Sequence, residues 1–372
     1  FCTLLAGRGS VPAMELEGLL RTELHCNALL HVPAAGALLC GMYEHNAGEN
    51  KRFGAVTMAP TAAVLDEKAW TKAAFEPVAG ATHVEGVFDM RLLNPTTVAM
   101  GRTDGSVTVL SVESPSVLTP LASVKASDEM VTTAFAVGNN TLLTTHHKGA
   151  VSLVHTEGMV LKQWAAHDFD AWTGDVMPSG AVACTGGDDG KLKLWDLRQL
   201  GGSAGAADDD DDEAPTAAAT TRFDCGVVSV LAHGSHGGAG GLAEHHLLVG
   251  TYDEQVALLD TRAMKRPVAS ASLGGGAWRI RPLAGTAAPS RGNFAVAAMH
   301  GGAIEVTVDA TKDGDDIITV ADDERRFHCH KDDVLVYDVA PLPDGRVASV
   351  SFYDNELCVW KPKAASDAAQ DG

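Results

Sequence analysis

The sequence predicts an all-β protein, a seven-bladed β-propeller, on three observations. First, residues 182–198, VACTGGDDGKLKLWDLR, form two strand patterns joined by an Asp-Gly turn. Lys191, Lys193 and Trp195 alternate with two leucines, the period of two that is typical of a strand with one buried face. Second, similar hairpins recur along the chain at steps of 41 to 64 residues. Third, one hairpin cannot bury its own apolar face, so the copies should pack together as blades around an axis.

Seven segments can be aligned with this hairpin, and most contain a pair of strand patterns around a tight turn. The expected period is about 40–45 residues, and insertions explain the longer steps. Leu259–Asp260 stands in the fifth segment where the fourth has Trp-Asp. The segments are, in order, LLCGMYEH with FGAVTMA (38–45, 53–59), VFDMRLL with TVAMGRTDGSVTVLSV (87–93, 97–112), VTTAFAVG with TLLTTHHKGAVSLVHT (131–138, 141–156), the hairpin 182–198 with its lead-in 166–180, GVVSVLAH with HLLVGTYDEQVALLDTR (226–233, 246–262), GGAWRIRPL with FAVAAMHGGAIEVTV (275–283, 294–308) and VLVYDVAPLPDG with RVASVSFYDNELCVWKP (334–345, 346–362).

We expect a single propeller domain over residues 14–363, with tails at 1–13 and 364–372. A strand from Met14–Glu23 should complete the seventh blade. Sharing one blade between the two chain ends removes an exposed sheet edge. The closure of the ring should therefore depend on both ends of the domain.

Two segments are expected to be loops. An acidic insert at about 201–220 has no strand pattern, and a Gly-rich loop spans 233–246. The insert follows the third strand of its blade, which places it on the end of the ring opposite the predicted site described below. Deleting 203–220 should leave stability and activity nearly unchanged.

Composition narrows the possible functions. The net charge is −20, and the run 208–213 supplies only six of the negative charges. An acidic surface argues against nucleic-acid binding and fits a basic protein partner better. No apolar run reaches the roughly 18 residues of a membrane span. Seven cysteines without a CxxC pair fit a reducing compartment, so we expect a cytoplasmic protein with buried thiols. We also expect the protein to be a monomer.

Histidine clusters raise the question of a metal site. Four histidines lie in or next to the Gly-rich loop, but a flexible Gly tract holds no ligand geometry. His328 and His330 share one face of a strand pattern, and two ligands make a poor site. We therefore expect no metal ion and no cofactor.

The candidate site follows from propeller geometry. When four strands run from the axis outward, the turn between the second and third strands lies on the same end of the ring as the link to the next blade. Uncommon polar and aromatic residues fall in these turns and links, so they should surround one opening of the central channel, which we call the mouth. They are His167, Asp168, Trp172, Asp189, Tyr252, Asp253, Trp278, Arg279, His300, His330, Tyr353 and Asp354.

Two interpretations of these residues stay open. Turn aspartates and lead-in histidines commonly hydrogen-bond within a blade, so Asp189, Asp253, Asp354 and His167 could be structural. His300 occupies a turn position where Asp is usual, which favours a functional role. Large aromatic side chains at a mouth also serve as anchors for a partner.

Several stretches resemble one known family, the diphthine methylesterases, which are WD40-repeat proteins of diphthamide biosynthesis. Leu259 and the acidic insert depart from the family pattern. The stretches that carry the resemblance are TELHCNALLHVP (22–33), LLCGMYE (38–44), AHDFDAW (166–172), GGDDG (186–190), GTYDEQVALLDTRAMKRPV (250–268), GGGAWRI (274–280), AAMHGG (297–302), LVY (335–337) and SFYDNELCVW (351–360).

The resemblance implies hydrolysis of the methyl ester of methylated diphthine, a modified histidine on translation elongation factor 2. The substrate carries a trimethylammonium group, which an acidic rim with exposed aromatic rings would attract. The mouth residues other than the catalytic candidates would bind this substrate.

A propeller has no place for a G-x-S-x-G nucleophile elbow, and the one match to that pattern, GGSAG (201–205), lies in the acidic insert, which has no strand pattern. His300, His330 and His167 are candidate bases, and a histidine-activated water is the favoured mechanism. Ser351 is a candidate nucleophile, whereas Cys184 fits a buried core position. The alternative function is a non-catalytic adaptor that holds a protein partner at the same mouth.

Overall fold

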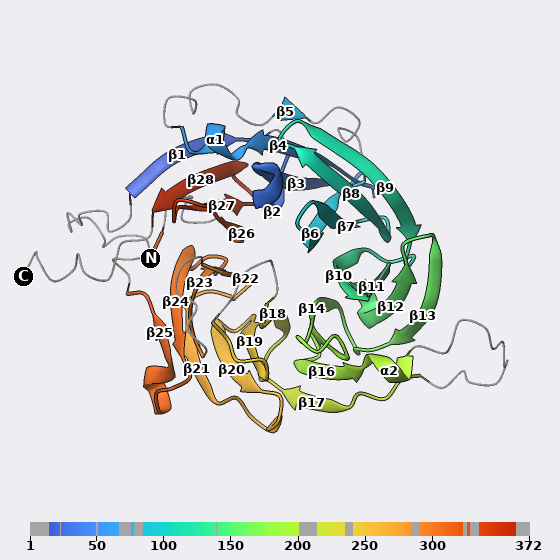
Figure 1. Ribbon diagram of the computed structural model, residues 1–372, viewed down its shortest axis with the longest axis vertical. Coiled ribbons are helices and arrows are strands. Elements are labelled where there is room, and N and C mark those ends of the chain that lie inside the picture. Colours follow the sequence, from blue (N-terminus) through green and yellow to red (C-terminus); the bar gives the residue numbers. More distant parts are fainter. Residues whose placement is uncertain are drawn as a thin grey trace, which may run out of the picture.

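The computed structural model describes residues 15–22, 24–49, 51–66, 76–77, 85–138, 140–200, 214–234, 241–283, 290–322, 326–327 and 335–361. Seven four-stranded antiparallel sheets surround a central axis, as Figure 1 shows. The predicted seven-bladed propeller is therefore confirmed. Within the described residues, no helix has the length and apolar character needed to cross a bilayer.

Each blade is numbered by its place along the chain, and its strands run outward from the axis. Blade 1 holds β2 (Cys26–Val32), β3 (Ala37–Asn46), β4 (Lys51–Pro60) and β5 (Glu76–Pro77), and blade 2 holds β6 (Val87–Asn94), β7 (Thr97–Arg102), β8 (Ser106–Ser114) and β9 (Val117–Lys125). Blade 3 holds β10 (Val131–Gly138), β11 (Thr141–His146), β12 (Ala150–His155) and β13 (Met159–Ala165). Blade 4 holds β14 (Ala171–Val176), β15 (Val182–Gly187), β16 (Lys191–Asp196) and β17 (Ala219–Arg222).

The remaining blades follow the same order. Blade 5 holds β18 (Val227–Ala232), β19 (His246–Thr251), β20 (Gln255–Asp260) and β21 (Ala269–Ser272); blade 6 holds β22 (Arg279–Pro282), β23 (Arg291–Ala297), β24 (Ala303–Asp309) and β25 (Ile318–Val320); blade 7 holds β26 (Val336–Pro341), β27 (Val347–Ser351), β28 (Glu356–Lys361) and β1 (Glu15–Arg21). The short helical segments are α1 (Thr61–Val64), α2 (Leu197–Leu200), η1 (Pro33–Ala35), η2 (His147–Gly149) and η4 (Gly314–Ile317).

Both chain ends contribute to blade 7, as the sequence predicts. Strand β1 pairs antiparallel with β28, from Glu15 opposite Lys361 to Arg21 opposite Glu356. The edge of β28 is thus covered, and the ring closes through hydrogen bonds between the first and last described strands.

The apolar interior is divided among the blades. Seven clusters of buried side chains each join two neighbouring blades, and the cluster between blades 5 and 6 contains Leu258, Phe294 and Ile304. Each blade therefore buries both faces against its neighbours, which explains why an isolated hairpin of this sequence could not fold alone.

Glycines in the inner turns let the turns pack on the links between blades. Gly149 has a φ of +80°, and a Cβ added there would stand 2.1 Å from the His167 carbonyl oxygen. Gly105 is similar, with a φ of +86° and the Ser127 carbonyl at 2.1 Å. Only glycine combines this left-handed backbone with so close an approach.

Both predicted loops contain residues that have a defined place in the fold. Strand β17 includes Thr220, which pairs with Lys193, so the insert boundary at 220 is wrong and the strand begins at Ala219. Leu242 of the Gly-rich loop is buried in the cluster between blades 5 and 6, because a leucine gains more by packing than by remaining in a mobile loop. Residues 201–213 and 235–240 lie outside the described part.

Candidate functional site

Four of the residues predicted at one mouth, Trp172, Tyr252, Trp278 and Tyr353, take part in ring contacts there. The inner strand of each blade begins at this end, and all seven blades contribute to one cluster of apolar and aromatic side chains, which we call the mouth cluster. Its members are Tyr43, Phe88, Met130, Trp172, Val228, Trp278, Met299, Leu335 and Tyr337. Because this cluster lies at the axis rather than between two blades, it is distinct from the seven structural cores.

Trp278 lies at the centre of the ring contacts. Its ring centroid is 5.5 Å from that of Trp172, 5.2 Å from that of Tyr337 and 5.9 Å from that of Tyr252. Phe88 packs on Trp172 with ring centroids 5.9 Å apart in a stacked arrangement. Such offset and edge-to-face contacts are the favourable geometries of aromatic pairs.

All four tyrosines of the chain converge on this mouth. Tyr43, Tyr337 and Tyr353 each lie 5.0 to 5.4 Å from the Phe352 ring centroid, and Tyr252 contacts Trp278. Burial, together with the neighbouring phenols, raises the pKa of Tyr252 and Tyr337, and burial raises that of Tyr43 to about 12. The phenols of Tyr43, Tyr252 and Tyr337 are therefore neutral at physiological pH and present rings and hydroxyl groups.

A carboxylate and a histidine complete the rim beside these rings. Trp172 Nε1 donates a hydrogen bond to Asp188 Oδ1 at 2.6 Å. Asp188 is exposed, and partial desolvation raises its pKa while the Trp172 hydrogen bond opposes that shift. His147 meets the Trp172 ring edge-to-face at 5.1 Å between ring centroids. A negative charge thus lies against the aromatic rings.

Arg279 lies one residue deeper along β22 and is buried. Its Nη1 donates to the Trp278 carbonyl at 3.0 Å, and its Nε is 3.7 Å from Asp89 Oδ1. Nε and Nη2 have no hydrogen-bond partner in the described structure. Burial lowers the pKa of this guanidinium, while Asp89 and Asp338 oppose the shift. Arg279 thus presents unpaired donors beneath the mouth cluster.

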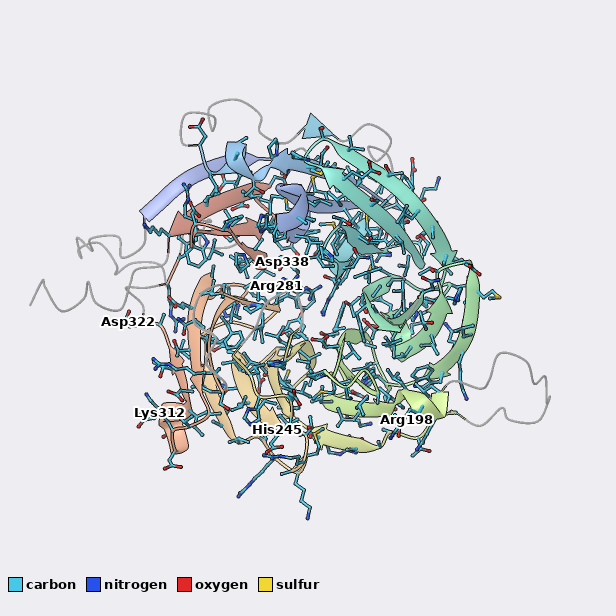
Figure 2. The ribbon with its side chains drawn as sticks, viewed as in Figure 1. Arg198, His245, Arg281, Lys312, Asp322 and Asp338 are labelled. Atoms are coloured by element: carbon cyan, nitrogen blue, oxygen red, sulfur yellow. The ribbon has the colours of Figure 1, made fainter. Side chains whose placement is uncertain are left out.

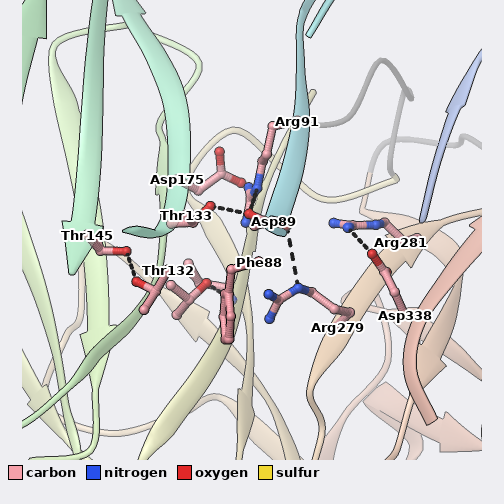
Figure 3. Close-up of polar contacts among 12 residues, drawn as sticks. Phe88, Asp89, Arg91, Thr132, Thr133, Thr145, Asp175, Arg279, Arg281 and Asp338 are labelled. Atoms are coloured by element: carbon pink, nitrogen blue, oxygen red, sulfur yellow. Dashed lines mark hydrogen bonds and ion pairs between the residues drawn. The ribbon is translucent and has the colours of Figure 1, made fainter. Parts of the chain in front are cut away.

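A layer of charged side chains follows further along the channel, as Figure 3 shows. Asp89 accepts hydrogen bonds from Arg91 Nε at 3.3 Å and from Thr133. Arg281 Nη2 donates to Asp338 Oδ2 at 3.0 Å. Because these charges are buried, their pairing keeps the cost of desolvation low and fixes the inner strands relative to one another.

A cavity of about 1400 Å³ opens at the other end of the channel, opposite the predicted mouth. The far ends of the inner strands line it, with Arg91, Asp175 and Arg281 among the polar groups. Sequence reasoning gave no site at this end. The cavity wall is predominantly aliphatic, and it contains Phe135 but no tryptophan or tyrosine.

His167 and Asp189 are held within blade 4. His167 Nδ1 bonds Asp189 Oδ1 at 2.9 Å and Nε2 bonds Thr185 Oγ1 at 2.9 Å, while Trp195 Nε1 donates to the same hydroxyl at 2.8 Å. Burial alone would raise the pKa of Asp189, but His167 and two backbone amides lower it to about 2. Both imidazole nitrogens are occupied, which favours the structural interpretation of His167 and Asp189.

The other turn aspartates also form local bonds. Asp253 Oδ1 accepts from Thr251 Oγ1 at 2.5 Å, and Asp354 Oδ1 accepts from the Glu356 amide at 3.0 Å. Ser351 is fully buried, and its Oγ has no partner among the residues described. A hydroxyl enclosed in this way does not meet a substrate at the rim.

His300 and Tyr353 lie at the exposed rim. His300 Nε2 is 3.3 Å from Glu254 Oε1, and its side chain is 54% exposed. The structure describes no ring contact between His300 and the mouth cluster. Tyr353 is 58% exposed and contacts Phe352. His330 lies outside the described residues, so the predicted meeting of His300 and His330 stays a prediction.

One group of potential metal ligands occurs among the described residues, namely His245, His246 and Asp260. Figure 2 shows His245 at the periphery, whereas Arg281 and Asp338 lie near the axis. Arg262 binds both carboxylate oxygens of Asp260, with Nη2 at 2.6 Å from Oδ2 and Nε at 3.0 Å from Oδ1. This carboxylate is already neutralised, which disfavours a cation there.

The cysteines are mostly, but not all, free thiols. Cys26, Cys40, Cys184 and Cys225 are free, and burial raises the pKa of Cys184 far above its usual range. A buried thiol with a raised pKa is a weak nucleophile, in agreement with a core role. Cys358, in contrast, is part of a disulfide, which the sequence reasoning did not expect.

Sequence reasoning missed most side chains of this site, among them Tyr43, Phe88, His147, Asp188 and Tyr337. A signal was available for the tyrosines. There are only four in 372 residues, and each lies near the mouth end of a strand or in an inner turn. Asp188 was overlooked because the neighbouring Asp189 occupies the usual blade-turn position.

Comparison with known proteins agrees with the fold. The model of the "WD domain, G-beta repeat" family matches residues 158–196 and 312–361. Among solved structures, a chain of the "Crystal Structure of Mitotic Checkpoint Complex" aligns over 98% of this chain and 97% of its own length, with a TM-score of 0.66 and 13% identity. That likeness shows the fold alone. The chain is a seven-bladed β-propeller, two segments of which match WD repeats, and aromatic and acidic side chains gather at one of its mouths.

The similar curated proteins carry one name. A Dictyostelium discoideum protein named "Diphthine methyltransferase homolog" is 29% identical over 54% of this chain and 52% of its own length. The Schizosaccharomyces pombe "Diphthine methyltransferase" is 25% identical over 75% of this chain and 79% of its own length. The human protein of that name is 34% identical over 32% of this chain and 22% of its own length. The sequence thus resembles the diphthine methyltransferases, although it matches only about half of the Dictyostelium protein.

Proposed function

We propose that this protein acts in diphthamide biosynthesis and hydrolyses the methyl ester of methylated diphthine on elongation factor 2 at the mouth described above. The similarity to proteins named diphthine methyltransferase supports the pathway. The proposed substrate is a modified histidine that carries a trimethylammonium group and a methyl ester. We expect the protein in the cytoplasm, where its substrate would take part in translation.

The single observation that carries the proposal is the convergence of aromatic rings and a carboxylate. A trimethylammonium group cannot donate a conventional hydrogen bond, so it is recognised by charge and by the faces of aromatic rings. Tyr252 and Tyr353 are 41% and 58% exposed, and Trp172 lies beside Asp188. These groups offer both kinds of attraction within one mouth.

Ester hydrolysis requires a base for water and a donor for the developing oxyanion. Histidines at the rim supply bases, and the unpaired nitrogens of Arg279 supply a donor beneath the rings. Methyl transfer, the activity that the names of the relatives state, is the second candidate. The two reactions differ in their products, because hydrolysis releases methanol whereas transfer consumes a methyl donor and adds a methyl group.

The test uses purified protein and elongation factor that carries methylated diphthine. We expect methanol release and loss of one CH₂ from the mass of the modified peptide, with no added methyl donor. Gain of a methyl group that depends on S-adenosylmethionine would instead support transfer. Stable binding of the factor without either product would support the adaptor function and contradict the proposal.

A pair of variants connects the reaction to the mouth. Tyr252→Ala removes a ring face, whereas Tyr252→Phe retains it and removes only the hydroxyl. If the rings bind the cation, the alanine variant should raise KM for the modified factor about 10-fold, and phenylalanine should change it little. Equal effects of both changes would show that the hydroxyl, not the ring, makes the contact.

A further inference from the structure

A histidine that the sequence reasoning passed over is held rigidly at the mouth. His147 lies in η2, the inner turn of blade 3. Its backbone amide donates to the Met130 carbonyl at 3.1 Å, and the next amide, that of Lys148, donates to Asp170 Oδ1 at 2.7 Å. Lys148 has a φ of +60°, a left-handed conformation that these two bonds maintain. The turn is thus fixed between the inner strand of blade 3 and the lead-in to blade 4.

The imidazole of His147 faces the mouth cluster. Its ring meets Trp172 edge-to-face, and Trp172 in turn is held by Asp188 and packs against Phe88 and Trp278. His147 Nε2 is enclosed and has no hydrogen-bond partner within the described residues. The ring is only partly buried, which leaves Nδ1 as the nitrogen that can meet water.

The charges around His147 suit a group that gains and loses a proton. Burial lowers its pKa, so the imidazole is neutral at physiological pH. Asp170, Glu129 and Asp188 oppose that shift, whereas Arg52 adds to it. Three carboxylates would therefore stabilise the imidazolium once it forms, and the side chain of Lys148 is itself paired with Glu129 at 2.5 Å.

We propose that His147 is the base that activates water for ester hydrolysis at this mouth, an assignment that rests on the function proposed above. Nδ1 accepts a proton from water as the water oxygen bonds to the ester carbonyl carbon. When the tetrahedral intermediate collapses, the bond to the methoxy oxygen breaks and the imidazolium returns the proton to that oxygen. The products are methanol and the carboxylic acid, which loses its proton to solvent.

His147 fits this role better than the histidines predicted from sequence. Both nitrogens of His167 are bonded within blade 4. His300 is paired with Glu254 at the outer rim. His147, in contrast, touches the Trp172 ring, beside which the trimethylammonium group of the substrate is expected to bind.

The experiment compares His147→Gln with His155→Gln, which alters a histidine at the opposite end of the same blade, and with His300→Gln. Methanol release from the modified elongation factor is measured together with the melting temperature and the affinity for the factor. We expect His147→Gln to lower kcat about 100-fold with little change in affinity or melting temperature, and His155→Gln to behave as the wild type. Added imidazole should restore part of the activity of His147→Ala.

The outcomes separate the two proposals. No methanol release by the wild type would overturn the proposed function and this assignment with it. Release by the wild type that is undiminished in His147→Gln, or a large loss in His300→Gln alone, would overturn the assignment of His147 only. If the variants unfold, the pH profile of wild-type activity tests whether His147 is the base. The acidic limb of kcat/KM should lie below about pH 6.5, the usual imidazole pKa, and a limb above that value would contradict His147 as the base.

Discussion

Trp172 and Asp188 form one unit at the mouth, because the indole N–H donates to the carboxylate at 2.6 Å. The two residues belong to the same blade, one at the start of β14 and the other in the turn after β15. The bond fixes the orientation of the ring, and the same carboxylate places a negative charge at the edge of the ring. A cation at this ring would therefore be attracted by the π system and by the charge together.

This relationship predicts the effect of Asp188→Asn. The amide oxygen can still accept from Trp172, so the ring should keep its place while the charge is lost. We expect the affinity for the modified elongation factor to fall about 10-fold at low salt, and less at high salt because exposed charges are screened. Binding titrations at two ionic strengths check this, and an equal loss at both would contradict an electrostatic role.

The hydrogen-bonded set in blade 4 predicts a stability effect. His167→Ala would leave Asp189 buried without its main partner and would free Thr185 from one of its bonds. Removing one partner of such a buried pair should lower the free energy of unfolding by about 3 kcal/mol. Urea unfolding measures this loss, with His155→Ala as the control. If stability is unchanged but activity disappears, the imidazole is catalytic after all.

His146 predicts a pH dependence of stability. It is buried, Nε2 bonds Thr144 and Ser152 at 2.9 and 3.0 Å, and burial lowers its pKa to about 3. The unfolded chain binds this proton below about pH 6.5, whereas the native state does not until about pH 3. Native stability should therefore decrease as the pH falls through that window.

The variant His146→Gln isolates this contribution. One group changes the slope of the unfolding free energy by at most about 1.4 kcal/mol per pH unit. Between about pH 4 and 6 the variant should show a shallower slope than the wild type in urea unfolding. Parallel slopes for the two proteins would mean that His146 is already protonated in the native state.

Deleting the acidic insert should leave stability and activity nearly unchanged, provided that the deletion does not remove residues of β17. Removing residues 201–213 joins α2 to the chain before Ala219 and eliminates the run 208–213. We expect the melting temperature and methanol release to change little. A deletion that extends to Thr220 should destabilise blade 4, because Thr220 pairs with Lys193. Loss of turnover in the shorter deletion would place the insert near the substrate.

Local patterns predicted the blades and their closure. The Asp-Gly turn before Lys191 and the alternation up to Trp195 are properties of adjacent residues, and the repeat of such hairpins predicts the ring. The same topology predicts that inner turns and links share one end. Trp278 and Tyr353 could therefore be assigned to the mouth without a structure.

The chemistry of the site was harder to predict, because it depends on contacts between blades. Tyr43 of blade 1 packs on Phe352 of blade 7 only because ring closure places these two blades side by side. His147 and Trp172 come from neighbouring blades, and their contact depends on how the turn of η2 is held. Whether a histidine is bonded within its blade, as His167 is, depends on side-chain geometry that its position in the repeat does not specify.

The pairing of β1 with β28 has a consequence for how the protein is made. Strand β1 leaves the ribosome long before its partner, Glu356–Lys361, because the rest of the propeller lies between them. Blades 1 to 6 can form one after another during translation, whereas the mouth, to which all seven blades contribute, can be completed only after β28 has been synthesised. A nascent chain that stops before Glu356 would hold six finished blades and no assembled mouth, so binding at the mouth would report that the ring has closed.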